Sequence, residues 1–242
     1  MSYADNPYRA PLGDFAAMAA VDERTSFITR TYLHLAGAVT LFVALEAVLL
    51  QTAVPETMLN MLGRSQYSWL IVLGLFMVVS MIAGNWARSA VNPATQYMGL
   101  GLYVVAEAVI FLPLLYIAQQ MDAMRGTNII QSAAVATLGL FGLMTAAVFI
   151  TRKDFSFLRT FLIFGSLAAM GFIVVAILFH IAIGPILIYA MIALACGYIL
   201  YDTSNVLHHY RIGQHVAASL ALFASLALLF WYILQLFMSR RD

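Results

Sequence analysis

Seven apolar stretches, each about as long as a membrane-spanning helix, constrain the fold of this chain more than any other feature. An α-helix needs about 20 mostly apolar residues to cross the hydrocarbon core of a bilayer. Short connections separate the stretches, which leaves no room for a large extramembrane domain. The sequence therefore predicts an all-α, polytopic membrane protein with seven transmembrane helices, at roughly Tyr32–Val54, Tyr67–Ala87, Tyr97–Ala118, Ile130–Ile150, Thr160–Ile181, Gly184–Asp202 and Val216–Met238.

Composition agrees with a chain whose main partner is the lipid bilayer. Of its 242 residues 63% are hydrophobic and 10% are charged, whereas soluble domains carry about 25% charged residues. The net charge of +1 supplies no basic face to neutralise phosphates, so no nucleic-acid partner is expected. Residues 1–28 contain Asp5, Asp14, Asp22 and Glu23 and lack an apolar core, which argues against a signal peptide. We predict a polar, mostly disordered tail at 1–28 and one transmembrane domain at 29–242.

Basic residues in the short loops predict the orientation of the spans. Cytoplasmic loops carry an excess of Lys and Arg. The side that holds the N-terminus collects the larger set, namely Arg9, Arg24, Arg30, Arg88, Arg152, Lys153, Arg159 and Arg211. The opposite side collects Arg64, Arg125, Arg240 and Arg241. This distribution predicts a cytoplasmic N-terminus. The basic C-terminal residues leave one alternative open, a re-entrant last helix that would return the C-terminus to the cytoplasm.

Three acids lie within or at the edge of the spans: Glu46, Glu107 and Asp202. An ionised acid at mid-bilayer costs about 3 kcal/mol on insertion scales, so intramembrane acids usually have a partner or a function. Glu46 lies in the outer half of the first span and could reach water. Glu107 has Tyr103 one turn before it and Pro113 further along. Each acid could be a proton-sensitive switch, or a hydrogen-bonded structural residue.

Asp202 stands out because its polar surroundings are patterned. On a helix, Tyr198, Asp202 and Asn205 share one face. The sixth span should end at Asp202 on the cytoplasmic rim, which Arg88 also reaches at the end of the second span. Arg88 is therefore the predicted ion-pair partner of Asp202, and Arg211 is a weaker candidate. Such a pair could hold the second and sixth spans together until Asp202 is protonated.

The remaining polar residues give no sign of enzymatic chemistry. His208, His209 and His215 follow Asp202, but adjacent histidines point in different directions on a helix and complete no zinc site. They form either a pH sensor at the rim or a solvated loop. The chain has no Gly-rich phosphate loop, no HExxH motif and no Ser–His–Asp order. We expect no enzyme and no cofactor.

Two separated motifs carry a resemblance to a known family. They are Thr151-Arg152-Lys153-Asp154-Phe155-Ser156-Phe157-Leu158 and Ile199-Leu200-Tyr201-Asp202-Thr203-Ser204-Asn205-Val206, with weaker support from Arg30-Thr31-Tyr32 and Ser239-Arg240-Arg241-Asp242. The chain from about residue 24 onward resembles the Bax-inhibitor (transmembrane Bax inhibitor motif) family, and within it the bacterial YccA-like branch. This resemblance implies a bacterial inner membrane protein whose last helix is central, surrounded by the other six.

The resemblance also implies site residues. Some family members are proton-sensitive calcium leaks, in which acids in spans six and seven share a proton and an arginine at the end of span two pairs with one of them. Matched by motif, Asp202 is the first acid and Arg88 the arginine. Ser225 occupies the position of the second acid, as in the YccA-like branch. Ser225 could donate a hydrogen bond to Asp202, but a hydroxyl supplies no second charge, which puts gating by an acid pair in doubt.

Three functions remain open at this stage. The first is a cation leak, most plausibly for calcium, with Glu107 and Asp202 as oxygen ligands and an Arg88–Asp202 pair closing the inner end. The second is a non-transporting regulator or substrate of a membrane-bound FtsH-type AAA protease, which would grip the N-terminal tail. The third is a stress-associated membrane protein with purely structural acids. Oligomeric state, permeant ion and the side of the C-terminus stay open.

Overall fold

The computed structural model describes residues 14–65, 67–89, 92–181 and 184–239. Seven of its helices are long and apolar enough to cross a membrane. The prediction of an all-α, polytopic membrane protein is therefore confirmed. These helices are α1 (Val21–Leu49), α3 (Ser68–Ala87), α4 (Pro93–Arg125), α5 (Ile129–Thr151), α6 (Leu158–Leu178), α7 (Pro185–His208) and α8 (His215–Ser239).

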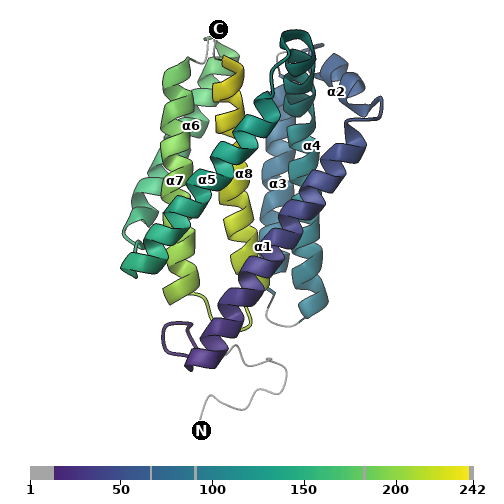
Figure 1. The fold of residues 1–242 in the computed structure, drawn as a ribbon. Coiled ribbons are helices and arrows are strands. Elements are labelled where there is room, and N and C mark those ends of the chain that lie inside the picture. The colour runs from purple at the N-terminus through teal and green to yellow at the C-terminus, as the bar shows by residue number, and fades with distance from the viewer. Residues whose placement is uncertain (1–13, 66, 90–91, 182–183, 240–242) are drawn as a thin grey trace.

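The long helices run alternately up and down in one bundle (Figure 1). We call the end where α1 begins the N-side, which is the lower end in Figure 1, and the opposite end the C-side. α8 lies in the middle of the bundle and packs on α1, α4, α5 and α7. Small residues on α8, among them Ala218, Ser219 and Ser225, are buried and let neighbouring helices approach closely. The central last helix implied by the resemblance is therefore present.

The last helix crosses the bundle without a break. Its 25 residues correspond to about 37 Å at 1.5 Å per residue, longer than the hydrocarbon core. α8 starts on the N-side and ends at Ser239 on the C-side (Figure 1). The re-entrant alternative is therefore wrong for the described part of the chain, and Arg240 and Arg241 lie outside the described residues.

The start of the chain differs from the prediction. α1 begins at Val21, inside the predicted tail. Residues just before it pair with the α7–α8 loop: the Ala16 amide donates to the Tyr210 carbonyl at 2.9 Å, and the Ile212 amide donates to the Asp14 carbonyl at 3.0 Å. The structure thus differs from the predicted disordered tail over 14–28: residues 14–16 contact the α7–α8 loop, and the chain is helical from Val21. Residues 1–13 lie outside the described residues.

A short helix on the C-side is absent from the sequence prediction. α2 (Val54–Leu62) follows the end of α1 at Leu49, with Pro55 in its first turn. Proline favours a helix start because its missing amide would be unpaired there anyway. The predicted first span, which ran to Val54, therefore contained the end of one helix and the start of another.

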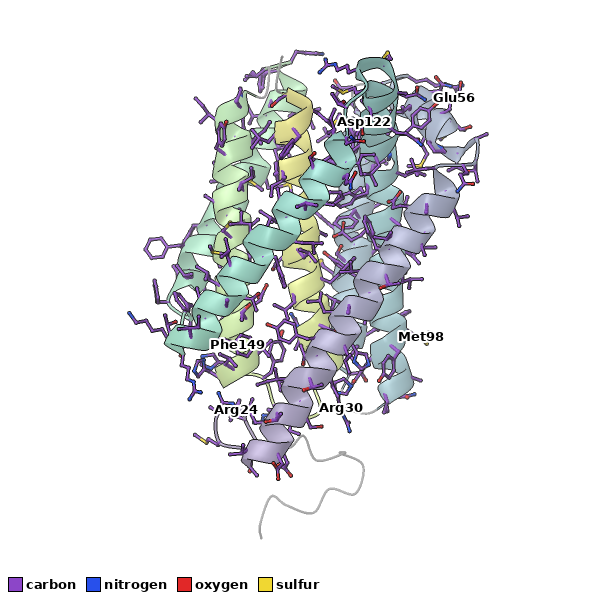
Figure 2. The ribbon with its side chains drawn as sticks, in the orientation of Figure 1. Arg24, Arg30, Glu56, Met98, Asp122 and Phe149 are labelled. Atoms are coloured by element: carbon purple, nitrogen blue, oxygen red, sulfur yellow. The ribbon has the colours of Figure 1, made fainter. Side chains whose placement is uncertain are left out.

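Charged side chains mark the two ends of the bundle (Figure 2). Arg24 and Arg30 lie toward the N-side, whereas Glu56 and Asp122 lie toward the C-side. Asp122 fixes the turn between α4 and α5, because its carboxylate accepts hydrogen bonds from the Thr127 hydroxyl at 2.8 Å and the Ile129 amide at 2.7 Å. These bonds satisfy part of the first turn of α5, whose amides have no partner within the helix.

Candidate functional site

A cavity of about 1000 Å³ lies between α3, α4, α6, α7 and α8. Its lining follows the central helix from Ala217 near the N-side to Gln235 near the C-side. At 1.5 Å per residue, this separation is about 27 Å. The hydrocarbon core of a bilayer is about 30 Å thick, so the cavity extends through most of the depth of the membrane.

The two halves of the cavity differ in chemistry. The C-side half is lined mainly by apolar side chains, with Tyr232 and Gln235 as exceptions. The N-side half holds most of the polar groups. They come from all five surrounding helices and are Ser80, Arg88, Tyr103, Glu107, Ser166, Tyr198, Tyr201, Asp202 and Ser225.

Asp202 is buried in the N-side half, with a fractional exposure of 8%. It accepts a hydrogen bond from the Ser225 hydroxyl. Tyr103 also lies close enough for an electrostatic interaction with Asp202. α7 continues to His208, which puts Asp202 about 9 Å inside the helix end. The prediction that the sixth span ends at Asp202 on the rim is therefore wrong, because the polar residues after Asp202 continue the helix.

The predicted Arg88–Asp202 ion pair is not formed in this structure. Both residues line the cavity and interact electrostatically. However, the ion pair with atoms within 4.0 Å found among the described residues joins His209 and Asp154. The charged atoms of Arg88 and Asp202 therefore lie further apart than 4.0 Å. Arg88 caps the end of α3 with an exposed side chain, whereas Asp202 lies deeper in the bundle. Ser225, and not Arg88, is the direct partner of Asp202.

Glu107 is an acid that faces the inside of the bundle. It lines the same cavity as Asp202 and is 6% exposed. The Tyr103 side chain lies next to the Glu107 carboxyl and also interacts with Asp202. The Tyr103 side chain therefore lies near two carboxyl groups that come from different helices.

The other residues predicted around Asp202 divide into two groups. Tyr198 lines the cavity, and its hydroxyl lies 2.8 Å from the Ser166 hydroxyl of α6. Asn205 lies outside the cavity lining, and its backbone carbonyl accepts from the His209 amide at the end of α7. Arg211 lies 4.8 Å over the Phe15 ring. Arg211, the weaker candidate, thus contacts the segment before α1. Asn205 contributes a backbone hydrogen bond at the end of α7.

Glu46 is buried but does not belong to the cavity. It is 4% exposed, and neither carboxyl oxygen has a hydrogen-bond partner among the described residues. The sequence left open that Glu46 reaches water, but in the structure the neighbouring helices cover this face of α1. Glu46 nonetheless provides a matched reference for the acids in the cavity, since it is an equally buried carboxyl group outside the cavity lining.

A polar contact at the N-side joins the two motifs noted in the sequence. Asp154, in the loop between α5 and α6, accepts from the Ser156 amide at 2.9 Å and contacts the His209 ring nitrogen at 3.0 Å. The Phe155 amide donates to the Ser204 hydroxyl of α7 at 2.9 Å. The loop is therefore attached to the end of α7, immediately beyond Asp202. Both motifs were visible in the sequence, but their contact was not.

The three N-side histidines do not form one cluster. His209 contacts Asp154, whereas the His208 ring nitrogen donates to the Ser204 carbonyl at 3.0 Å. His215 instead packs on His34 of α1, with ring centroids 4.9 Å apart. No group of three or more His, Cys, Asp or Glu side chains able to hold a metal ion occurs within the described part of the chain.

Asp154 supports a prediction about stability and pH. Partial burial opposes its ionisation, but hydrogen bonds from Ser156 and His209 outweigh this and hold the pKa of Asp154 below its usual value. A lowered folded-state pKa stabilises the fold above the ordinary aspartate pKa of about 3.9, and this stabilisation disappears as pH falls through the folded-state value. Asp154→Asn should therefore lower the unfolding temperature slightly at pH 7 and leave it unchanged at strongly acidic pH.

The expected change is small because the side chains of Asp154 and His209 are 44% and 48% exposed, and exposed pairs contribute less than about 1 kcal/mol. Thermal unfolding in detergent, followed from strongly acidic pH to pH 7, would measure this change in unfolding temperature. Glu56→Gln, at the opposite end of the bundle (Figure 2), is the control. Equal stability of the wild type and Asp154→Asn at pH 7 would contradict the prediction.

Comparison with known proteins places the chain in a family. The family model described as "Inhibitor of apoptosis-promoting Bax1" matches residues 24–242. Protein LIFEGUARD 4 of Arabidopsis thaliana is 28% identical over 146 residues, which cover 59% of this chain and 57% of the relative. Bax inhibitor 1 of Schizosaccharomyces pombe is 29% identical over 174 residues, covering 70% of this chain and 62% of the relative.

A bacterial relative is also similar to this chain. An uncharacterized protein of Pseudomonas aeruginosa is 28% identical over 163 residues, covering 67% of this chain and 68% of the relative. The chain thus spans little more than half the length of LIFEGUARD 4 and about two thirds of the Pseudomonas protein. No solved structure matches. Because the family model covers all seven spans and both motifs, the chain belongs to the Bax inhibitor family of multi-pass membrane proteins.

Proposed function

We propose that this protein is a cation leak pathway, with calcium as the permeant ion, through the cavity around α8. One observation carries the proposal: Glu107 and Asp202, far apart in sequence, line a single cavity that follows α8 through most of the membrane depth. Calcium prefers oxygen ligands such as carboxylates. Acids inside a membrane bundle commonly mark ion pathways.

Control of the pathway is proposed at its N-side end. Arg88 is exposed at the mouth of the cavity, and Asp202 lies deeper with Ser225 as its hydrogen-bond partner. A movement that brought Arg88 onto Asp202 would close this end and neutralise one cation ligand. Protonation of Asp202 would remove the attraction for Arg88. The Arg88–Asp202 pair is thus a proposed closed state, and the separation seen here is compatible with an open N-side end.

The orientation and location follow the distribution of charge. The described N-side carries the larger set of basic residues, including Arg24, Arg30 and Arg159. Cytoplasmic loops are enriched in such residues. We therefore propose a cytoplasmic N-side and, with the YccA-like resemblance and the Pseudomonas relative, a bacterial inner membrane.

Calcium flux into liposomes that contain the purified protein tests the leak. Asp202→Asn and Glu107→Gln should each reduce flux by about tenfold, equivalent to about 1.4 kcal/mol, because each removes one carboxylate from the pathway. Glu46→Gln is the matched control, since Glu46 is an equally buried acid outside the cavity lining, and should conduct like the wild type. Wild-type flux equal to that of empty liposomes would refute the leak. Equal losses in all three variants would exclude a specific role for the cavity acids.

A regulator or substrate of an FtsH-type protease remains the alternative. Its proposed contact was the N-terminal tail, but residues 14–16 lie against the α7–α8 loop and α1 begins at Val21. The segment that a protease could grip without unfolding this contact is therefore shorter than the 28 residues first considered. Deletion of residues 2–13 separates the two proposals. The leak predicts unchanged calcium flux, whereas the regulator predicts loss of copurification with the protease.

A further inference from the structure

The cavity opens sideways toward the bilayer between α3 and α6. α3 packs mainly on α4, and α6 packs on α7, but within these fully described helices no packed interface joins α3 to α6. Methionines near the middle of both helices line the cavity and are also exposed on the bundle surface: Met77 on α3 at 48% and Met170 on α6 at 36%. Flexible methionine side chains on both sides form an entrance that can adapt to what passes between them.

The C-side half of the cavity is a poor site for water. Along α3, α4 and α6 its lining includes Trp69, Leu73, Phe76, Leu114, Ile117, Ile173 and Ile177. A buried water needs two to four polar partners, and apolar cavities in proteins stay dry. An empty space of this kind also loses the dispersion contacts of its walls. An apolar group from outside the protein would restore these contacts.

The bilayer supplies such a group directly at the entrance. We infer that one acyl chain of a phospholipid from the C-side leaflet enters between α3 and α6 and occupies the C-side half of the cavity. Along α8, the distance from Gln235 to Ala224 is about 16 Å, close to half the thickness of the hydrocarbon core. A chain from this leaflet would therefore end where Ser225 and Glu107 begin the polar half.

The polarity of the cavity favours this leaflet over the other one. Trp69 and Gln235 lie near the C-side end of the lining, where an aromatic and an amide side chain suit the head-group region. A chain from the N-side leaflet would instead lie against Asp202, Tyr198 and Ser225. The inference concerns what fills the cavity and does not rest on the calcium leak. While the acyl chain is in place it blocks the C-side half, so ions would pass only after the chain has left.

Tryptophan fluorescence can detect this chain. The protein has three tryptophans, so Trp69→Phe combined with Trp86→Phe leaves Trp231 alone. Trp231 belongs to the central helix, lines the cavity and packs against Phe111 at 5.0 Å. Bromine atoms on a lipid chain quench tryptophan only on close contact. In vesicles of brominated phosphatidylcholine, Trp231 should be quenched to an extent comparable with Trp86, which is 38% exposed and is measured in the matching chain that retains only Trp86.

Two neighbouring alanines on α6 provide a blocking variant and its control. Ala169 lines the cavity, whereas Ala168 is exposed and does not. Ala169→Phe should fill the path of the chain and relieve the quenching of Trp231, and Ala168→Phe should not. An unquenched Trp231 in brominated vesicles would overturn the inference, even if Ala169→Phe failed to fold. The inference would also be overturned if acrylamide, a quencher dissolved in water, quenched Trp231 instead. It would be overturned as well if a folded Ala169→Phe variant left the bromine quenching unchanged. The readout needs no ion flux, so it stays valid if the leak proposal fails.

Discussion

Replacing Gly99 by alanine should destabilise the bundle by about 3 kcal/mol, at the upper end of the usual cost of overpacking. A Cβ atom at Gly99 would lie 2.5 Å from the Ala87 nitrogen and 2.6 Å from the Ala83 oxygen. Both are backbone atoms of α3, so no side chain can rotate out of the way. α3 and α4 would have to separate, and α3 provides one wall of the cavity.

Gly101→Ala is the matched control for Gly99→Ala. Gly101 lies on the same helix two residues further on, and a Cβ atom there would meet nothing within 4 Å. Alanine favours a helix over glycine by about 1 kcal/mol, so Gly101→Ala should be neutral or slightly stabilising. Unfolding in mixed micelles with increasing denaturing detergent would compare the two. Equal stability of both variants would show that α3 and α4 do not approach as closely as the structure indicates.

Phe111→Ala should cost a similar amount, about 3 kcal/mol. Phe111 is 1% exposed and contacts three aromatic rings: Phe42 of α1 at 5.2 Å, Phe230 of α8 at 5.6 Å and Trp231 at 5.0 Å between ring centroids. Truncating a buried phenylalanine costs about 3–5 kcal/mol in soluble proteins, where lost transfer from water and the new cavity both contribute. In a bilayer the lipid is as apolar as the core, so the cavity and lost packing account for most of the cost.

Phe164→Ala gives the reference for Phe111→Ala. Phe164 is the same residue type in a spanning helix, but it is 67% exposed on the bundle surface. Lipid can replace its contacts, so its removal should change stability by less than about 0.5 kcal/mol. The same detergent titration measures both variants. If Phe164→Ala were as destabilising as Phe111→Ala, the cost would come from apolar side chains in general and not from packing around α8.

The sequence predicted the spanning helices closely where hydropathy decides their extent. The second span, predicted at Tyr67–Ala87, is a helix at Ser68–Ala87. The prediction failed where polar residues continue a helix, because polarity alone signals a loop. Asp22 and Glu23 begin α1 and were assigned to the tail, and the residues after Asp202 continue α7 to His208. Contacts with other elements stabilise these segments, and a local pattern does not contain them.

The residues of the candidate site could be predicted from the sequence better than the contacts between them. Asp202, Glu107, Tyr198, Ser225 and Arg88 were each selected from the sequence, and all five line one cavity. Asp202 and Glu107 were conspicuous because a polar group in an apolar span is costly, whereas Ser225 was selected through the family resemblance. Glu46, Arg211 and Asn205 were also selected from the sequence, but they do not line this cavity. Whether a polar residue faces a cavity depends on how its helix is rotated within the bundle. The sequence does not determine this rotation, because these helices are apolar on all sides.

The sequence by itself determined that seven helices cross a membrane and that carboxyl groups lie within them, since both follow from the free energy of placing side chains in hydrocarbon. Tertiary structure decided which of these groups meet. It joined Asp202 to Ser225 and kept Arg88 apart, attached the Asp154 loop to α7, and left an opening between α3 and α6. The reason is physical: hydropathy is a property of single segments, whereas contacts between helices depend on the packing of all of them at once.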